Sequence, residues 1–112
     1  MCKKEYTAML AEKVQAEYDD FIAEIKTKSA DEIIESVYQI VTKDEITTFC
    51  RECEPKLEEK QFKALLSSRN TLHEIFEQWC KLEELHGLED IVVAIEETAD
   101  RILGALQHSE KI

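Results

Sequence analysis

Apolar residues recur at spacings of three or four along most of the chain, and no stretch alternates apolar and polar residues between turn-forming residues. This spacing places side chains on one face of an α-helix, so the pattern predicts amphipathic helices and no strands. The first stripe predicts a helix over residues 3–26, with Lys and Glu on its other side. Its apolar positions are Tyr6, Leu10, Val14, Tyr18, Phe21, Ile22 and Ile25.

A second helix is predicted to begin after Ser29, because Ser29 and Glu32 have the spacing of a capping box, in which each side chain bonds the other residue's backbone amide. Its broad apolar stripe predicts burial on more than one side. Thr42 and Glu45 repeat the capping pattern, so we expect a break at residues 42–43 and a third, short helix after it. The stripe consists of Ile33, Ile34, Val37, Tyr38, Ile40 and Val41.

The third predicted helix ends before Pro55, because the proline ring removes a hydrogen-bond donor and clashes with the preceding turn. We expect its inward face to consist of Ile46, Phe49, Cys50 and Cys53. A fourth helix is predicted over residues 58–66, with Phe62, Leu65 and Leu66 facing inward. Residues 67–70, Ser-Ser-Arg-Asn, form the clearest loop in the chain.

The longest periodic segment covers residues 72–106 and follows a third capping pattern at Thr71 and Glu74. Its apolar stripe changes face near Gly87, which predicts a kink, a short break or two halves that pack on different neighbours. The second half also fits a coiled-coil dimer seam, although such a pattern is more often the core face of a bundle helix. Its seam positions are Leu85, Leu88, Val92, Ile95, Ala99, Ile102 and Leu106.

These segments together predict an all-α fold. We expect a single small helical bundle of about five helices, with a long C-terminal helix in which the kink or break falls. The length of 112 residues fits one domain covering residues 1–112. Two Gly and one Pro leave little material for tight hairpins, and no internal repeat or low-complexity linker divides the chain.

The charge of the chain is strongly unbalanced, with 14 Lys and Arg against 25 Asp and Glu, a formal net charge of -11. A negative field of this kind repels nucleic acid and anionic membranes and speeds encounter with basic partners. The sequence shows no apolar segment that predicts a signal peptide or a membrane span, so we expect a cytoplasmic protein. Its four cysteines are then expected to be free thiols.

The sharpest local motif is the pair Cys50 and Cys53, since two thiolates at this spacing can share a zinc ion or form a redox pair. Zinc needs further ligands, for which His73, Cys80 and His86 are candidates. We favour core packing over metal, because the pair falls on the apolar stripe of a helix and a free cysteine there behaves as a small hydrophobe. No metal or other cofactor is therefore expected.

Catalytic signatures are missing from the sequence: it has no Gly-rich phosphate loop, no nucleophile elbow and no His-Glu-x-x-His. Glu83 and His86 have the spacing of a ferritin-like ligand pair, but a second copy is absent. The three histidines have no local partners of the kind that general-base catalysis needs. We therefore expect a protein that is not an enzyme.

Two rows of carboxylates follow the last predicted segment and are the candidate partner-binding residues. The rows are Glu83, Asp90 and Glu97, and beside them Glu89, Glu96 and Asp100. Such rows can imitate a line of phosphates and occupy a basic groove that otherwise holds nucleic acid. For any one row a solvated helix face is the commoner explanation, and the charge of the whole chain is what favours mimicry.

A set of residues between positions 29 and 103 resembles an uncharacterised family of small proteins, a domain of unknown function found in gut bacteria, their phages and mobile elements. The residues that carry this resemblance are Glu32, Ile33, Ile34, Tyr38, Thr42, Asp44, Glu45, Ile46, Leu57, Gln61, the block from Lys63 to Ser68, Leu72, Phe76, Trp79, Glu83, Asp90, Ile95, Glu96 and Ala99. The resemblance implies a helical accessory domain without catalytic residues. Phages and mobile elements often encode small acidic inhibitors of host defence, so by analogy this chain is a candidate anti-CRISPR protein.

The functional expectation is a non-enzymatic, acidic protein-binding module that blocks the basic groove of a nucleic-acid-binding host protein, such as a CRISPR nuclease. Direct nucleic-acid binding and membrane binding are not expected from the charge. Two alternatives from other classes stay open: a zinc-stabilised module built on Cys50 and Cys53, and a homodimeric scaffold paired through residues 88–106.

Overall fold

The computed structural model describes residues 2–53, 55–81 and 88–110, with side chains described up to residue 81 and from 91 to 106. Within these residues the chain forms six α-helices and no strand, which confirms the predicted all-α fold. The helices are α1 Lys3–Ile25, α2 Ala30–Glu35, α3 Val37–Glu52, α4 Glu59–Ser67, α5 Thr71–Cys80 and α6 Leu88–Glu110.

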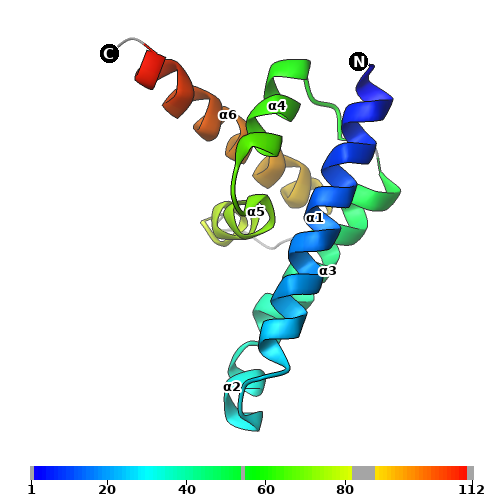
Figure 1. Cartoon of the computed structure of the whole chain (residues 1–112), viewed down its shortest axis with the longest axis vertical. Coiled ribbons are helices and arrows are strands. Elements are labelled where there is room, and N and C mark those ends of the chain that lie inside the picture. Colours follow the sequence, from blue (N-terminus) through cyan, green and yellow to red (C-terminus); the bar gives the residue numbers. More distant parts are fainter. Residues whose placement is uncertain (1, 54, 82–87, 111–112) are drawn as a thin grey trace.

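Helices α1 and α3 run side by side along the molecule (Figure 1). Helices α4, α5 and α6 gather around one end of this pair, while α2 lies at its opposite end (Figure 1). The molecule is elongated as a result, with extents of 45 × 31 × 28 Å. We call residues 19–45 the arm: they comprise the last part of α1, all of α2 and the first part of α3.

The hydrophobic core lies entirely at the end where α4, α5 and α6 meet the other two helices. Every helix except α2 contributes to it, and among the described residues no member of the core cluster belongs to the arm. The largest fully buried side chain is that of Phe62, whose ring stacks on Tyr6 with ring centres 5.7 Å apart. The cluster consists of Tyr6, Leu10, Val14, Ile46, Cys50, Leu57, Phe62, Leu65, Leu72, Ile75, Phe76, Trp79, Ile91, Ala94, Ile95 and Ala99.

The first helix follows the sequence prediction closely. Its predicted stripe supplies the buried side chains Tyr6, Leu10, Val14 and Ile25, which lie three, four or more residues apart on one face. Tyr18 packs against the edge of the core, and the rest of the stripe is only half-buried because it passes into the arm. A face of this width is what an amphipathic helix needs in order to pack on a bundle.

The predicted break at residues 42–43 is wrong, because α3 continues through both. The chain breaks instead at Ser36, whose amide donates to the carbonyl oxygens of Glu32 and Ile33 at 3.1 and 3.0 Å. The start of α2 is as predicted, since the Ser29 hydroxyl accepts from the Glu32 amide at 3.3 Å. Thr42 and Lys43 are both buried on α3, so packing of that helix face overrides a local capping pattern.

The starts of α4 and α5 are each fixed by a side chain next to the helix. Glu58 and Gln61 form a capping box at α4. At α5 the predicted cap is wrong by one residue, because the Asn70 side chain accepts from the His73 amide at 3.2 Å. Thr71 is buried inside the helix, where its hydroxyl donates to the Leu65 carbonyl at 2.6 Å.

The last periodic segment forms two helices, α5 and α6, which pack against each other. The predicted change of face at Gly87 lies outside the described residues. Of the predicted seam, Ile95 and Ala99 are fully buried within the chain, whereas Leu106 is exposed. These seam residues therefore pack inside the helical bundle. The buried stripe of α6 is wider than predicted and comprises Ile91, Ala94, Ile95, Thr98 and Ala99.

Candidate functional site

The most unusual surface is a row of exposed apolar side chains on α2 and the first two turns of α3, which we call the α2–α3 apolar face. It consists of Ile34, Val37, Tyr38 and Val41, with exposed fractions of 67%, 49%, 58% and 51%. The sequence analysis predicted burial of these residues on more than one side, and that prediction is wrong. The reason is that α2 lies at the end of the molecule away from α4 and α6, so this face is covered only at one edge, where Tyr38 meets α5 (Figure 1).

Aromatic rings anchor one edge of this face. The ring centre of Tyr38 lies 5.7 Å from that of Trp79 and 6.4 Å from that of Phe76, both on α5. Phe76 and Trp79 themselves belong to the core. The Tyr38 ring is therefore held in place on its inner side while more than half of its surface stays open to solvent. Exposed aromatic residues of this kind are enriched at protein interfaces.

Carboxylates border the α2–α3 apolar face. Five exposed acidic side chains lie between positions 29 and 45, and the one cation in that stretch, Lys43, is buried. Over the whole arm, eight carboxylates stand against three lysines. The five exposed acidic residues are Asp31, Glu32, Glu35, Asp44 and Glu45.

The predicted acidic rows on the last segment are only partly within the described structure. Glu83 lies outside the described residues. Glu89 and Asp90 belong to α6, but the structure describes only their backbone. Glu97 accepts a hydrogen bond from Gln78 of α5 at 2.9 Å, and Asp100 accepts one from Gln61 of α4 at the same distance. These two carboxylates therefore tie α6 to its neighbours, and Glu96 is half-buried beside them.

Of the candidate metal ligands, Cys50, Cys53, His73 and Cys80 lie within the described residues, and His86 lies outside them. Cys50 is buried in the core, whereas Cys53, predicted to face inward, is exposed at the end of α3 in an extended conformation. Burial raises the pKa of the Cys50 thiol to about 12, which disfavours the thiolate that zinc requires. Nε2 of His73 lies 2.8 Å from Oε1 of Glu77, and Cys80 is exposed. In the described part of the chain, no group of three or more His, Cys, Asp and Glu side chains is arranged to hold a metal ion.

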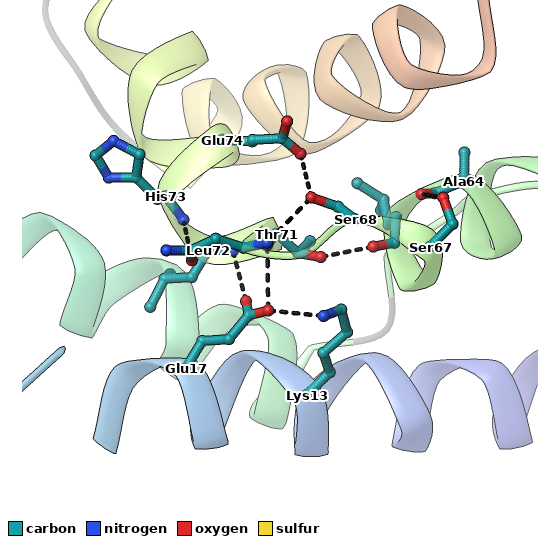
Figure 2. A network of polar contacts seen from close by, with 11 residues as sticks. Lys13, Glu17, Ala64, Ser67, Ser68, Thr71, Leu72, His73 and Glu74 are labelled. Carbon is teal, nitrogen blue, oxygen red and sulfur yellow. Dashed lines mark hydrogen bonds and ion pairs between the residues drawn. The ribbon is translucent and has the colours of Figure 1, made fainter. Parts of the chain in front are cut away.

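A polar network joins α1 to the start of α5 (Figure 2). The Glu17 carboxylate accepts from the amides of Thr71 and Leu72 at 3.2 and 2.8 Å, and it pairs with Lys13 at 2.7 Å. Asn70 accepts from the next amide. A carboxylate at a helix N-terminus also interacts favourably with the helix dipole. Glu17 thus satisfies backbone donors of α5 from a position more than fifty residues away in the sequence.

Beside this network, a half-open cleft of about 410 Å³ lies where α1, α3 and the start of α5 meet. Lys43 forms part of its wall and is only 5% exposed. Its ammonium nitrogen lies 4.0 Å from the ring centre of Phe21 and 5.7 Å from that of Phe76. Burial lowers the pKa of Lys43, and the negative charges of Glu24, Glu77 and Glu17 oppose that change.

Comparison of the chain with protein-family models, with curated proteins and with solved structures found no match. The family resemblance noted in the sequence therefore stays a prediction. Among the described residues, no helix combines the length and the apolarity that crossing a membrane requires.

Sequence reasoning missed both the α2–α3 apolar face and the Lys43 cleft. A signal for the first was present in the sequence: the stripe from Ile34 to Val41 is flanked by acidic residues, Asp31, Glu32 and Glu35 near its start and Asp44 and Glu45 after its end. A signal for the second was not, because Lys43 and the residues around it come from three helices far apart in the sequence.

Proposed function

We propose that this chain is a non-enzymatic protein-binding module that binds a basic protein surface through the α2–α3 apolar face. The observation that carries the proposal is that four apolar side chains close together in the sequence, including a half-exposed tyrosine, are open to solvent on α2 and the start of α3, with exposed carboxylates before and after them in the chain. Exposed apolar patches with a polar rim mark interaction sites in soluble proteins. Apolar contacts would supply affinity here, and the carboxylates would select the partner.

The low intrinsic stability of α2 supports the same proposal. This helix has six residues, none of them buried, and a helix of that length is marginal in water by itself. It nonetheless exposes Ile34, a costly residue to leave in solvent. A partner that covers Ile34 and Val37 would stabilise α2 and remove the exposed apolar surface at the same time.

A basic partner fits better than a second copy of this chain. Pairing two copies through the α2–α3 apolar face would bring two sets of five carboxylates together, and like charges across an interface oppose association. Lys and Arg of another protein would instead neutralise these carboxylates. The chain's net charge of -11 also accelerates encounter with a basic surface and repels nucleic acid.

The finer form of the proposal concerns what binding achieves. A basic surface on a nucleic-acid-binding protein normally holds phosphates, so an acidic module seated there competes with the nucleic acid. This chain would then act as an inhibitor of a host nuclease, of the anti-CRISPR type. The α2–α3 apolar face is a better candidate for the contact than the rows on α6, because Glu97 and Asp100 already accept hydrogen bonds within the chain.

The test measures binding to purified DNA-binding nucleases, a CRISPR nuclease among them, by biolayer interferometry at low and high salt. We expect binding that weakens with salt and that is lost in Val41→Ser and in Tyr38→Ala. Val93→Ser is the matched control, because Val93 is an exposed valine on α6. Loss of the apolar contact should weaken binding at least about tenfold, which corresponds to 1.4 kcal/mol.

A second pair of variants separates the two acidic surfaces. Reversing the charge in Glu35→Lys should weaken binding, whereas Glu96→Lys on α6 should have little effect. Equal losses from Val41→Ser and Val93→Ser, or a stronger effect of Glu96→Lys than of Glu35→Lys, would contradict the placement on α3. A doubled mass of the free chain in solution, abolished by Val41→Ser, would show a homodimer instead.

A further inference from the structure

The cleft between α1, α3 and the start of α5 is a second candidate site, separate from the α2–α3 apolar face. Its volume of about 410 Å³ falls within the range of small-molecule pockets in proteins. Phe21 and Ile25 of α1 supply an apolar side, and polar or charged side chains supply most of the rest. The cleft thus combines apolar surface with a few charged groups, as ligand sites do.

Lys43 is the residue that points to a ligand. It is nearly fully buried, yet within the described residues its ammonium group has no hydrogen bond and no ion pair, only the faces of two phenylalanine rings. An ammonium group has three N–H donors. The Lys43 nitrogen is not among the fully buried, unpaired polar atoms of the described residues, so it keeps contact with the water of the cleft. Because Lys43 lines the cleft, an oxyanion placed there would meet these donors directly.

Other charged residues line the cleft on several sides. Arg69 stands just before α5, Asp20 and Glu24 follow each other by one helical turn on α1, and Lys28 lies beyond the C-terminal end of α1. In the described structure none of these four side chains has a hydrogen bond or an ion pair with another residue, whereas the carboxylate of Glu17, which also lines the cleft, is already engaged. The cleft therefore offers unpaired cations at α3, before α5 and beyond the end of α1, together with two unpaired carboxylates on α1.

We propose that this cleft binds a small zwitterion of the amino-acid class. The ligand carboxylate accepts hydrogen bonds from Lys43 and Arg69, and the ligand ammonium donates to Asp20 or Glu24. A simple anion fits less well, because the α1 carboxylates and the net charge of -11 repel it. A simple cation leaves Lys43 unsatisfied. A zwitterion satisfies both sides and brings no net charge into an acidic protein.

The proposal is independent of the binding function assigned to the α2–α3 apolar face, since none of that face's four residues lines the cleft. The two can therefore fail separately. An amino acid that binds the cleft would shift the amide signals of Lys43, Asn70 and His73 whether or not the chain binds a basic protein.

The experiment is a titration of the isotope-labelled chain, followed by nuclear magnetic resonance. The ligands, added one at a time, are glycine, alanine, leucine, phenylalanine, glutamate and lysine. Each is added up to about 10 mM, so that weak binding with a millimolar dissociation constant, about 4 kcal/mol, is still detected. Acetate and methylamine, which each carry one half of the zwitterion, are titrated in parallel. We expect at least one amino acid to give saturable shifts around the cleft and to bind at least tenfold more tightly than either half-ligand.

Variants then assign the contacts. Lys43→Met and Asp20→Asn should each weaken binding at least tenfold, while Asp19→Asn should leave it unchanged. Asp19 is the matched control, because it neighbours Asp20 on α1 but does not line this cleft. Asp20 is exposed, so Asp20→Asn keeps the test valid even where Lys43→Met disturbs the fold.

Three outcomes would overturn the proposal: no saturable shift with any of the six amino acids, binding of acetate as tight as that of an amino acid, or equal loss from Asp19→Asn and Asp20→Asn. The second outcome would show a plain anion site at Lys43 and Arg69. The third would show a diffuse electrostatic effect of α1.

Discussion

The two ends of this molecule use the same kind of amphipathic helix in opposite ways. At one end, Phe62, Leu65 and Ile95 are fully buried. There α4 packs on α1, α5 packs on α1 and α3, and α6 packs on α4 and α5. In the arm, Ile34, Val37 and Val41 have the same apolar character and a comparable helical spacing, yet about half or more of each side chain is exposed. The difference lies in the neighbours: α4, α5 and α6 meet at the core end, whereas in the arm α5 reaches only one edge, at Tyr38 and Lys43.

Burial in the arm is limited and of a different kind. Its buried residues are Ile25, Thr42 and Lys43, and two of these three are polar. Core residues stabilise the fold by the removal of apolar surface from water, about 25 cal/mol for each Å². The arm contributes little of that free energy, so its sequence is under weaker constraint from stability. Its apolar residues are therefore better explained by binding than by folding.

The largest effect on the free energy of unfolding is expected when an aromatic ring is removed from the core. Phe62→Ala should lower the free energy of unfolding by about 3–5 kcal/mol, because Phe62 is fully buried and stacks on Tyr6. Val41→Ser in the arm should change it by about 0.5 kcal/mol or less, as exposed substitutions usually do. Urea unfolding followed by circular dichroism measures both. A loss of several kcal/mol from Val41→Ser would show that the arm is part of the folding core.

A smaller effect is expected where the arm joins the core, at the Glu17 carboxylate. Glu17→Ala leaves the amides of Thr71 and Leu72 without their acceptor, which should cost about 2 kcal/mol, the usual value for hydrogen bonds to a charged group. Exchange of amide hydrogens at the start of α5 should also become faster. Glu12→Ala, an exposed glutamate on the same helix, is the control.

Lys13→Ala separates the cap from the ion pair. If the cap carries the free energy, this variant should lose much less stability than Glu17→Ala, since the Glu17 carboxylate would still reach both amides. Equal losses from the two variants would mean that the pair at 2.7 Å, rather than the cap, stabilises the junction. A cost from Glu12→Ala as large as that of Glu17→Ala would instead indicate a general effect of charge on α1.

Local signals in the sequence were sufficient for the helices and for much of the core. The spacing of Tyr6, Leu10 and Val14 predicted both the extent and the buried face of α1, because side chains one turn apart must share a face. Pro55 and the Ser-Ser-Arg-Asn stretch likewise marked the chain on either side of α4. These features depend on residues within a few positions of each other.

The errors concern features that depend on distant neighbours. The Glu17 cap joins residues 54 and 55 positions apart, so no local pattern could reveal it. The exposure of Val37 and Val41 depends on which helices stop short of the arm, and a stripe looks the same in sequence whether or not it is covered. Thr42 shows the converse, because its capping pattern was overridden by burial on α3.

The exposure of Cys53 was missed for a related reason. Its spacing from Cys50 places it on the buried stripe only if the helix continues, but α3 ends at Glu52 and the chain turns extended at Cys53. The candidate site on α6 met a similar limit. The sequence showed that Glu97 and Asp100 lie on that helix, but not that Gln78 and Gln61 reach them.

The smallest expected effect concerns Lys43, the buried polar residue of the arm. At neutral pH, Lys43→Met should stay within about 1 kcal/mol of the wild type, because the cation–π contacts that it loses, worth about 0.5–2 kcal/mol, offset the cost of burying an ammonium group. The pH dependence is more informative than the value at one pH. It follows from the lowered pKa of Lys43 in the folded chain.

Between that lowered pKa and the unfolded value of 10.5, the unfolded chain binds more protons at Lys43 than the folded chain does, so this residue makes stability rise with pH. Tyr6, Tyr18, Tyr38 and Cys50 act in the opposite direction, because burial raises the pKa of each of these groups in the folded state. Their contribution to the free energy of unfolding is therefore lost at high pH. The wild type and Lys43→Met share these groups, so subtracting the two free energies of unfolding isolates Lys43. We expect the free energy of unfolding of the wild type to rise relative to that of the variant as the pH increases from the lowered pKa of Lys43 toward 10.5. A difference that stays constant or falls over that range would mean that the Lys43 ammonium is as well solvated in the folded chain as in the unfolded one, and the arm would then contain no buried charge.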